Sequence, residues 1–295
     1  MRIAHIIIAH KNPEQVLRLA TKLLHSNFDI FVHIDAKIEI EIFDGLRKLP
    51  NVFFIKNRIN CNWGGYSLLE GILSSLKEVL DSNNNYKYIN LISGQDYPVY
   101  NAEYINDFFN SSPDKIYISY ENSPDSNWWK DASKRYEKYH LTDYNFKGKY
   151  LIEKILNVIM PKRNFPTATT LYGSNKACWW ALTHESAKFV LSKLNDDPKL
   201  IRFLRLCWGT DEFVIPTIIM NSSLKKHVVN NNLRYINWSE GKAHPKILDM
   251  TDYEDIIQSK MLFSRKFDSE IDTSVMDKID DSHLDIQIMP LKNDA

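Results

Sequence analysis

The chain has 295 residues, of which 37 are Lys or Arg and 37 are Asp or Glu, so its formal net charge is zero. This balance argues against a nucleic-acid coat protein or a polybasic membrane-surface protein, because both need a large excess of cations. Hydrophobic residues make up 44% of the chain and charged residues 25%, which is typical of a folded globular protein. The length suits one large α/β domain or two small ones.

Glycine and cysteine usage excludes two further kinds of site. Only 9 residues are glycine, and neither GxGxxG nor GxxxxGK[ST] occurs, so a glycine-rich phosphate loop is not expected. Cys61, Cys178 and Cys207 are far apart and odd in number, which fits neither a clustered metal site nor an evident disulfide framework. The N-terminus leads into an apolar run too short to span a membrane. These features together predict a reducing, cytoplasmic location.

The first hundred residues alternate between strand and helix patterns. Apolar runs predict strands at 3–9, 29–34, 52–55 and 88–92, and amphipathic spacing predicts helices over 13–24 and 67–80. Such alternation is typical of a largely parallel, buried sheet, whose ligands bind beyond the carboxyl ends of its strands. His10, Asp35 and Asp96 each lie in a loop that follows a predicted strand, so these loops are candidate parts of a site.

The pattern weakens between residues 111 and 170, where the segments are aromatic and charged. An irregular stretch of that length is usually functional or mobile. Order returns with an apolar run at 179–182, a helix near 186–194, a second apolar run at 213–220 and a strand at 233–238. Residues 271–295 lack clear periodicity, and we interpret them as a peripheral tail.

Four carboxylates could carry chemistry, and each has a structural alternative. Asp35 follows an apolar strand in VHIDAK and could bind a ribose or a base, although a turn or capping aspartate is favoured about two to one on position alone. Asp211 and Glu212 precede an apolar run, where desolvation could raise a carboxyl pKa and create a general base. An acidic start to the next helix explains this pair at least as well.

Asp96 in SGQDYP has the same ambiguity as Asp35. Its neighbours Gly94 and Gln95 do not supply the second carboxylate of a metal site, so such a site has weak support. Cations gather near the C-terminus at Lys242, His244, Lys246, Arg265 and Lys266. Fixed cations could neutralise a diphosphate leaving group in place of a metal. For any one of these lysines, a solvated surface position is the simpler explanation.

A series of collinear strings resembles the core-2/I-branching glycosyltransferase family, which groups β-1,6-N-acetylglucosaminyltransferases with peptide O-xylosyltransferases and plant glucuronosyltransferases. In order they are IIIAHKNPEQ, VHIDAK, WGGYSLLEG, YINLISGQDYPV, KRY, GSNKACWWALTHESAKFVL, WGTDEFVIPTIIMNS, LRYINW, HPKIL and MLFSRKFD, spanning residues 3 to about 268. The resemblance implies a GT-A fold, which is an α/β fold with a Rossmann-like mixed sheet flanked by helices. We expect one catalytic domain over 1–270, with a nucleotide-binding half (1–110), an acceptor-side insert (111–170) and a catalytic, diphosphate-binding half (171–270).

The same resemblance suggests roles for individual residues. It makes Glu212 the catalytic base and Lys266 a diphosphate ligand, with Lys246 and Arg265 as further candidates for the diphosphate. It places His10, Asp35, Trp63 and Gly64 around the nucleotide, and Asp96, Arg135, Asp211 and Trp238 on the acceptor side. No metal and no other cofactor is implied.

The implied activity is transfer of a sugar, with GlcNAc as the leading candidate, from a UDP-sugar to a glycan hydroxyl with inversion, for example as a β-1,6 linkage. Xylosyl or glucuronosyl transfer and a non-catalytic carbohydrate-binding protein are the alternatives. Eukaryotic members have an N-terminal membrane anchor and paired cysteines, whereas this chain starts at its first strand, so we expect a compact bacterial member. Expected partners are a UDP-sugar and an oligosaccharide or lipid-linked glycan, without nucleic acid, with peripheral association at the inner face of the membrane allowed.

Overall fold

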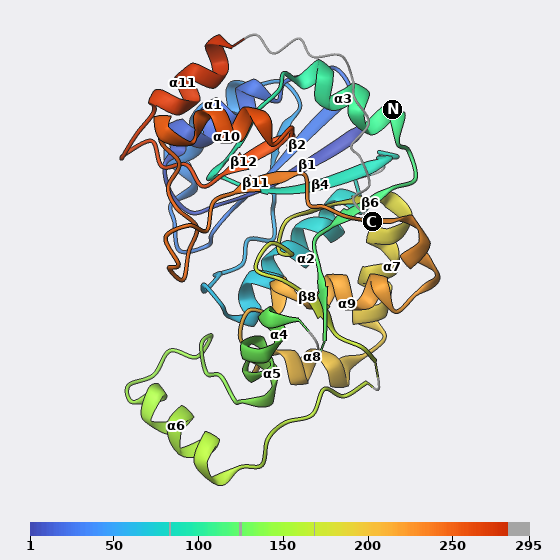
Figure 1. Cartoon of the computed structure of the whole chain (residues 1–295), viewed down its shortest axis with the longest axis vertical. Helices are drawn as coiled ribbons and strands as arrows, with labels where there is room; N and C mark the ends of the chain where they lie inside the picture. The colour runs from blue at the N-terminus through green and yellow to red at the C-terminus, as the bar shows by residue number, and fades with distance from the viewer. Residues whose placement is uncertain (83, 124–125, 168, 283–295) are drawn as a thin grey trace.

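A computed structural model describes residues 1–82, 84–123, 126–167 and 169–282 of the chain. Within these ranges the largest sheet is seven-stranded, in the order β10-β6-β9-β4-β1-β2-β3 (Figure 1). Its strands are β1 (Ile3–Ala9), β2 (Phe28–Ile34), β3 (Val52–Phe54), β4 (Tyr88–Ser93), β6 (Ile116–Ile118), β9 (Trp180–Thr183) and β10 (Val228–Asn230). β1 pairs in parallel with β2 and β4, whereas β9 is antiparallel to β4 and β6. The predicted α/β class with a Rossmann-like mixed sheet is confirmed.

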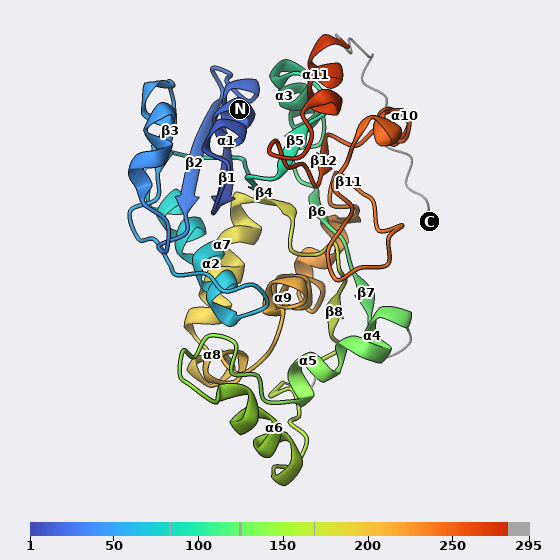
Figure 2. The same cartoon turned by 90° about the vertical axis from the view of Figure 1, so that its left-hand side faces the viewer.

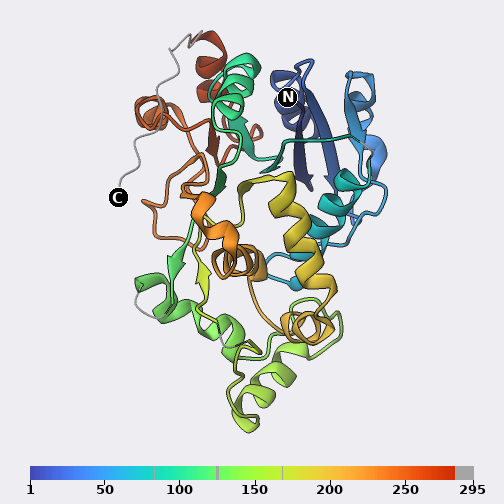
Figure 3. The same cartoon turned by 90° about the vertical axis from the view of Figure 1, so that its right-hand side faces the viewer.

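Both faces of this sheet are buried, since the central strands β1, β2 and β4 are buried along their whole length. Alternate residues of β1 point to opposite faces, so Ile3 and Ile7 join one core cluster and Ala4 and Ile6 join the other. The first cluster is covered by α1 (Pro13–Lys22), α3 (Ala102–Ser111), α10 (Tyr253–Gln258) and α11 (Ser274–Asp281). The second is covered by α2 (Tyr66–Leu80), α7 (His184–Asn195), α8 (Pro198–Leu204) and α9 (Val214–Met220), as Figures 2 and 3 show.

Short elements complete the described chain. The strands β5 (Asp96–Pro98), β11 (Arg234–Ile236) and β12 (Phe263–Arg265) form a second sheet, and β7 (Glu121–Asn122) pairs with β8 (Tyr172–Gly173). The 3-10 helices are η1 (Ile40–Lys48), η2 (Thr210–Glu212), η3 (Ser223–His227) and η4 (Met250–Asp252). β5 and β12 are antiparallel, and their register places Asp96 opposite Arg265. This pairing places Arg265 and its neighbour Lys266 beside the segment that follows β4.

Residues 111–170 are less irregular than the sequence predicts. They contain β6 and β7 and then α4 (Asn127–Ala132), α5 (Lys134–Glu137) and α6 (Lys149–Ile159). No residue of α6 is buried. Figures 1 to 3 all show α6 at the end of the molecule farthest from the main sheet. The helices α4 to α6 of the insert therefore form a helical lobe, whereas β6 belongs to the main sheet. That this lobe faces the acceptor stays a prediction.

The C-terminal segment also differs from the expected peripheral tail. α11 buries Val275, Met276 and Ile279 in the first core cluster. Asp280 accepts hydrogen bonds from the Arg18 guanidinium at 2.6 Å and from the Tyr97 hydroxyl at 2.6 Å. The helix spans only about two turns, too short for its amphipathic spacing to stand out in the sequence. Residues 283–295 lie outside the described residues.

Candidate active site

A cavity of about 890 Å³ lies at the carboxyl ends of the central parallel strands. His10 follows β1, Asp35 follows β2, and Gln95 follows β4, and all three line the cavity. Arg265 at the end of β12 and its neighbour Lys266 also line it. The loops selected from strand order alone therefore do converge, as expected for an α/β sheet.

Glu212 is held on the cavity wall by a tight turn. Gly209 precedes η2 with a positive φ of 62°, a conformation that glycine adopts at little cost. Its N–H donates to the carbonyl of Gly64 at 2.7 Å. A Cβ atom at position 209 would collide with the Arg135 guanidinium. Glycine at this position therefore lets the backbone before Glu212 lie directly against Arg135.

Arg135 is the direct partner of Glu212. Its Nη1 lies 2.5 Å from Glu212 Oε2, and its guanidinium carbon lies 4.9 Å and 4.4 Å from the ring centroids of Trp128 and Trp208. Burial raises the pKa of Glu212 to about 7; Arg135 opposes this rise and the neighbouring Asp211 adds to it. A carboxylate with a pKa near neutrality, on a cavity wall, suits a general base.

Asp211, the residue before Glu212, is buried and also lines the cavity. Burial raises the pKa of Asp211, and a hydrogen bond with Cys178 opposes that rise. Burial likewise raises the pKa of the Cys178 thiol. Since Asp211 is the more enclosed carboxylate, Glu212 is the better placed of the two to meet a hydroxyl.

The cations at the end of β12 have spare capacity for an anion. Arg265 is buried with its guanidinium carbon 4.2 Å from the Trp179 ring centroid, and its Nη1 has no hydrogen-bond partner within the described part of the chain. Burial, Arg265 and Lys11 lower the pKa of Lys266, and the nearby carboxylate of Asp268 is bonded to Lys11 at 2.5 Å. A buried guanidinium with unused donors is costly unless a ligand satisfies it. This region of the cavity is therefore suited to bind a phosphate or diphosphate.

Asp96 does not lie where the resemblance places it. It is fully buried and does not line the cavity. Its Oδ2 lies 3.5 Å from Arg234 Nε, and its Oδ1 lies 3.5 Å from Arg265 Nε. The structure thus makes Asp96 the counter-ion of two buried arginines rather than an acceptor contact, because the β5–β12 pairing turns it toward Arg265. The sequence analysis missed Arg234, whose partner lies 138 residues away.

Lys246 is also not brought to the cavity. Its ammonium lies 2.7 Å from Asp252 Oδ2 and 3.2 Å from Asp249 Oδ2. Hydrogen bonding to Asp252 raises the pKa of Lys246. Two carboxylates within the next six residues therefore satisfy it, and Lys242 and His244 of the same loop line the cavity instead.

Of the remaining nucleotide-side candidates, two line the cavity and one does not. Asp35 Oδ1 accepts the N–H of Lys37 at 2.9 Å, which is the turn role weighed from sequence, and the residue lines the cavity as well. Trp63 is 66% exposed on the cavity wall and packs edge-to-face against Trp208, with centroids 5.2 Å apart. Gly64 has a φ of 73° and packs against the Trp208 indole, where a Cβ atom would collide. Gly64 is therefore a packing residue rather than part of the lining.

Trp238, assigned to the acceptor side, lines the cavity. Its indole N–H is buried and has no hydrogen-bond partner among the residues that the structure describes. Across residues 1–82, 84–123, 126–167 and 169–282, no three His, Cys, Asp or Glu side chains gather in a way that could hold a metal ion. Over the same residues, every helix is too short or too polar to cross a membrane.

The profile of the family described as Core-2/I-Branching enzyme matches residues 3–261. The chain belongs to this family. It is similar to xylosyltransferase 2 of Canis lupus familiaris, with 23% identity over 304 residues that cover 95% of this chain and 33% of that protein. It is also similar to the β-glucuronosyltransferase GlcAT14A of Arabidopsis thaliana, with 24% identity covering 96% of this chain and 64% of the other. The chain thus spans about a third of the length of the xylosyltransferases that it matches.

Among solved structures, mouse xyloside xylosyltransferase 1 in its apo form aligns with a TM-score of 0.40 and 10% identity, covering 89% of this chain and 96% of that one. In this Core-2/I-Branching family member, the sequence analysis missed the aromatic side chains that hold the charged groups. Trp128 and Trp208 enclose Arg135, and Trp179 stacks on Arg265. The clustering of tryptophans beside charged strings was the available signal.

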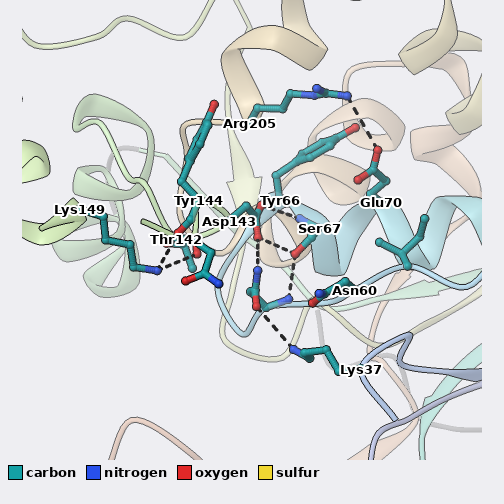
Figure 4. Close-up of a pocket in the computed structure, with 13 residues that line it drawn as sticks. Lys37, Asn60, Tyr66, Ser67, Glu70, Thr142, Asp143, Tyr144, Lys149 and Arg205 are labelled. Atoms are coloured by element: carbon teal, nitrogen blue, oxygen red, sulfur yellow. Dashed lines mark hydrogen bonds and ion pairs between the residues drawn. The ribbon is translucent and has the colours of Figure 1, made fainter. Parts of the chain in front are cut away.

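A second pocket of about 630 Å³ adjoins the first and shares Lys37 and Asn62 with it (Figure 4). Asp143 lies at its centre and accepts hydrogen bonds from the Ser67 backbone at 2.9 Å and from Asn62 Nδ2 at 3.1 Å. Lys149, the first residue of α6, lies on its far wall. This second pocket therefore connects the cavity of this family member to the helical lobe.

Proposed function

We propose that this chain is an inverting glycosyltransferase that moves a sugar from a UDP-sugar to a glycan hydroxyl. One observation carries the proposal: a single cavity holds Glu212, whose pKa is about 7, together with the two cations Arg265 and Lys266. Arg265 Nη1 has no hydrogen-bond partner among the described residues, and burial lowers the pKa of Lys266. A direct displacement of a nucleotide needs a base for the attacking hydroxyl and cations for the departing diphosphate.

In the proposed step, Glu212 takes the proton of the acceptor hydroxyl while the hydroxyl oxygen bonds to the anomeric carbon of the donor sugar. The bond from that carbon to the diphosphate oxygen breaks, and its electron pair leaves with UDP. Arg265 and Lys266 stabilise the added negative charge, which is the task that a divalent metal performs in many enzymes. His10, Asp35 and Trp63 are the proposed nucleoside contacts, and Trp238 an acceptor contact.

The leading donor hypothesis is UDP-GlcNAc, with a β-1,6 linkage as one product. The names of the relatives favour two alternatives, xylose and glucuronic acid. Thermal shift with UDP-GlcNAc, UDP-xylose and UDP-glucuronic acid, followed by assays of donor hydrolysis and transfer, distinguishes the three donors, because a ligand that binds only the native state raises Tm.

The proposed step uses no metal ion, so we expect full activity in excess EDTA. A strict requirement for Mn²⁺ would contradict the metal-free step. The cytoplasmic location and bacterial source expected from the sequence stay predictions.

The rival function is carbohydrate binding without catalysis, and Glu212→Gln separates the two. We expect the variant to lose about 10²–10⁴-fold in turnover, because glutamine cannot accept the acceptor proton. UDP affinity, measured by titration calorimetry, should stay within about twofold of wild type. Near-normal turnover would remove Glu212 as the base. A wild-type protein that binds sugars but transfers none with any donor would favour the rival.

A further inference from the structure

α6 exposes its apolar face to solvent, the reverse of the usual orientation of a surface helix. Tyr150, Leu151, Val158 and Ile159 are 74%, 63%, 78% and 68% exposed, and Ile155 is 48% exposed. Residues 151, 155, 158 and 159 recur at the spacing that places side chains on one helix face. A monomeric soluble protein rarely leaves so continuous an apolar stripe uncovered.

The opposite face of α6 is polar and is fixed to the lobe by hydrogen bonds. Glu153 Oε2 accepts the N–H of Leu141 at 2.7 Å. Asn157 accepts the N–H of Tyr139 at 2.8 Å and donates to the carbonyl of Tyr139 at 2.8 Å. These hydrogen bonds fix the rotation of α6 about its axis. They therefore hold the apolar stripe toward solvent.

The residues around the stripe carry positive charge and aromatic rings. Lys147 and Lys154 have no ion-pair partner among the described residues, whereas Lys149 donates to the carbonyls of Thr142 and Tyr144. Lys162 pairs with Glu137 at 3.0 Å, and Glu153, the acidic residue in that stretch, faces the lobe. Tyr144 and Phe146, just before the helix, are 45% and 42% exposed. An apolar stripe bordered by lysines and aromatic side chains matches the interfacial region of an anionic bilayer.

We propose that α6 docks in the plane of an anionic membrane surface, with Leu151, Ile155, Val158 and Ile159 in the acyl boundary and Lys147 and Lys154 at the headgroups. The helix has 11 residues and a length of about 16 Å, so it can lie on a bilayer but not cross it. Self-pairing of two such faces is disfavoured because it would bring Lys147 and Lys154 of one copy near those of the other.

Docking through α6 would also orient the candidate active site. α5, which carries Arg135, precedes α6 in the same lobe, and the pocket in Figure 4 leads from Lys149 to Lys37 and Asn62 on the wall of the catalytic cavity. A glycan on a lipid carrier would then reach the cavity from the membrane side. This consequence rests on the proposed function, whereas membrane binding by α6 does not.

The test is co-sedimentation of the full chain with vesicles of phosphatidylcholine alone and with 30 mol% phosphatidylglycerol, a composition chosen as roughly that of an anionic leaflet. We expect wild type to bind the anionic vesicles and to be released by raised salt. The double variant Val158→Asp/Ile159→Asp should bind at least about tenfold more weakly, because both side chains leave the acyl boundary. Ile271→Asp, an equally exposed isoleucine far from α6 in sequence, should bind like wild type.

Glu212→Gln should bind vesicles as wild type does, which separates failure of docking from failure of catalysis. Equal binding by the double variant and wild type, or no binding by wild type, would overturn the proposal. Light scattering gives the other contrary result: a wild-type dimer that the double variant converts to monomer would show that a second copy covers this face. Circular dichroism of the double variant confirms that it remains folded.

Discussion

The ion pair between Arg135 and Glu212 determines the charge state of the proposed base. Burial favours the neutral carboxyl group, and the guanidinium at 2.5 Å favours the carboxylate. Because these effects oppose each other, Glu212 titrates near neutrality instead of staying protonated or fully ionised. Arg135 is therefore a positioning and pKa-setting residue that the sequence had assigned only to the acceptor side.

This balance predicts a pH profile. Glu212 must be deprotonated to act, so with a pKa of about 7 its activity should fall about tenfold for each pH unit below that value. Arg135→Ala removes the group that lowers this pKa, so the acidic limb of kcat/KM should move to higher pH, and Arg135→Lys should restore part of the shift. Lys134→Ala, which removes an exposed partner of Asp131, is the control. An unshifted limb in Arg135→Ala would show that another group titrates.

The cations near the C-terminus give a matched comparison. Lys266→Ala should weaken UDP binding by about 10–100-fold, since a charge-assisted contact with a phosphate is lost. Lys246→Ala should leave UDP affinity unchanged and lower the free energy of unfolding by about 1 kcal/mol, since its partners are Asp249 and Asp252. Titration calorimetry and urea unfolding measure the two effects. The reverse pattern would return Lys246 to the diphosphate site.

At the scale of elements, short connections rather than long helices position the reactive groups. η2 holds Glu212, and the β5–β12 pair sets the orientation of Arg265 through Asp96. Each element has only three residues. Elements this short depend on tertiary contacts for their conformation.

The turn at Gly209 can be tested against a second glycine of the same conformation. Gly209→Ala should lower kcat/KM by at least about tenfold, because its methyl group would displace Arg135 from Glu212 and the positive φ is strained for alanine. Gly148 has a φ of 86°, and no described atom lies within 4 Å of the carbon that alanine would add there. Gly148→Ala should therefore lose only the stability that a positive φ costs alanine and keep its kcat/KM. Equal activity of the two variants would show that the close approach at Gly209 has no role in catalysis.

At the scale of the whole molecule, the cavity is assembled from both halves of the chain. His10 and Asp35 come from the first parallel strands, and Glu212 and Lys266 follow more than 170 residues later. α11 then packs against the same core cluster as α1 and ties the C-terminal segment to it through Asp280. The described C-terminal helix is thus part of the fold that holds the cavity.

This packing predicts a stability difference between two methionines. Met276→Ala should lower the free energy of unfolding by about 2–5 kcal/mol, because the side chain is fully buried and its removal leaves a cavity. Met250→Ala, at a residue 44% exposed, should cost under about 1 kcal/mol. Denaturant unfolding measures both. A small effect of Met276→Ala would support the peripheral tail predicted from the sequence.

The sequence by itself determined the local elements near the N-terminus and which loops converge. β1, β4 and α2 lie within about one residue of their predicted bounds, because buried strands and amphipathic helices have signals contained in consecutive residues. The carboxyl ends of parallel strands then meet at one edge whatever the side chains are. His10 and Asp35 were found in this way.

Only the tertiary structure decided what each charged residue faces. Asp96 meets Arg234 and Arg265, and Lys246 meets Asp252 instead of the cavity. The outward apolar face of α6 likewise depends on hydrogen bonds to the backbone at 139–141. A hydrophobic pattern shows that a helix has an apolar face, but not what that face contacts. Equal numbers of cations and anions likewise do not show which residues form ion pairs, because pairing depends on distances that only the folded chain sets.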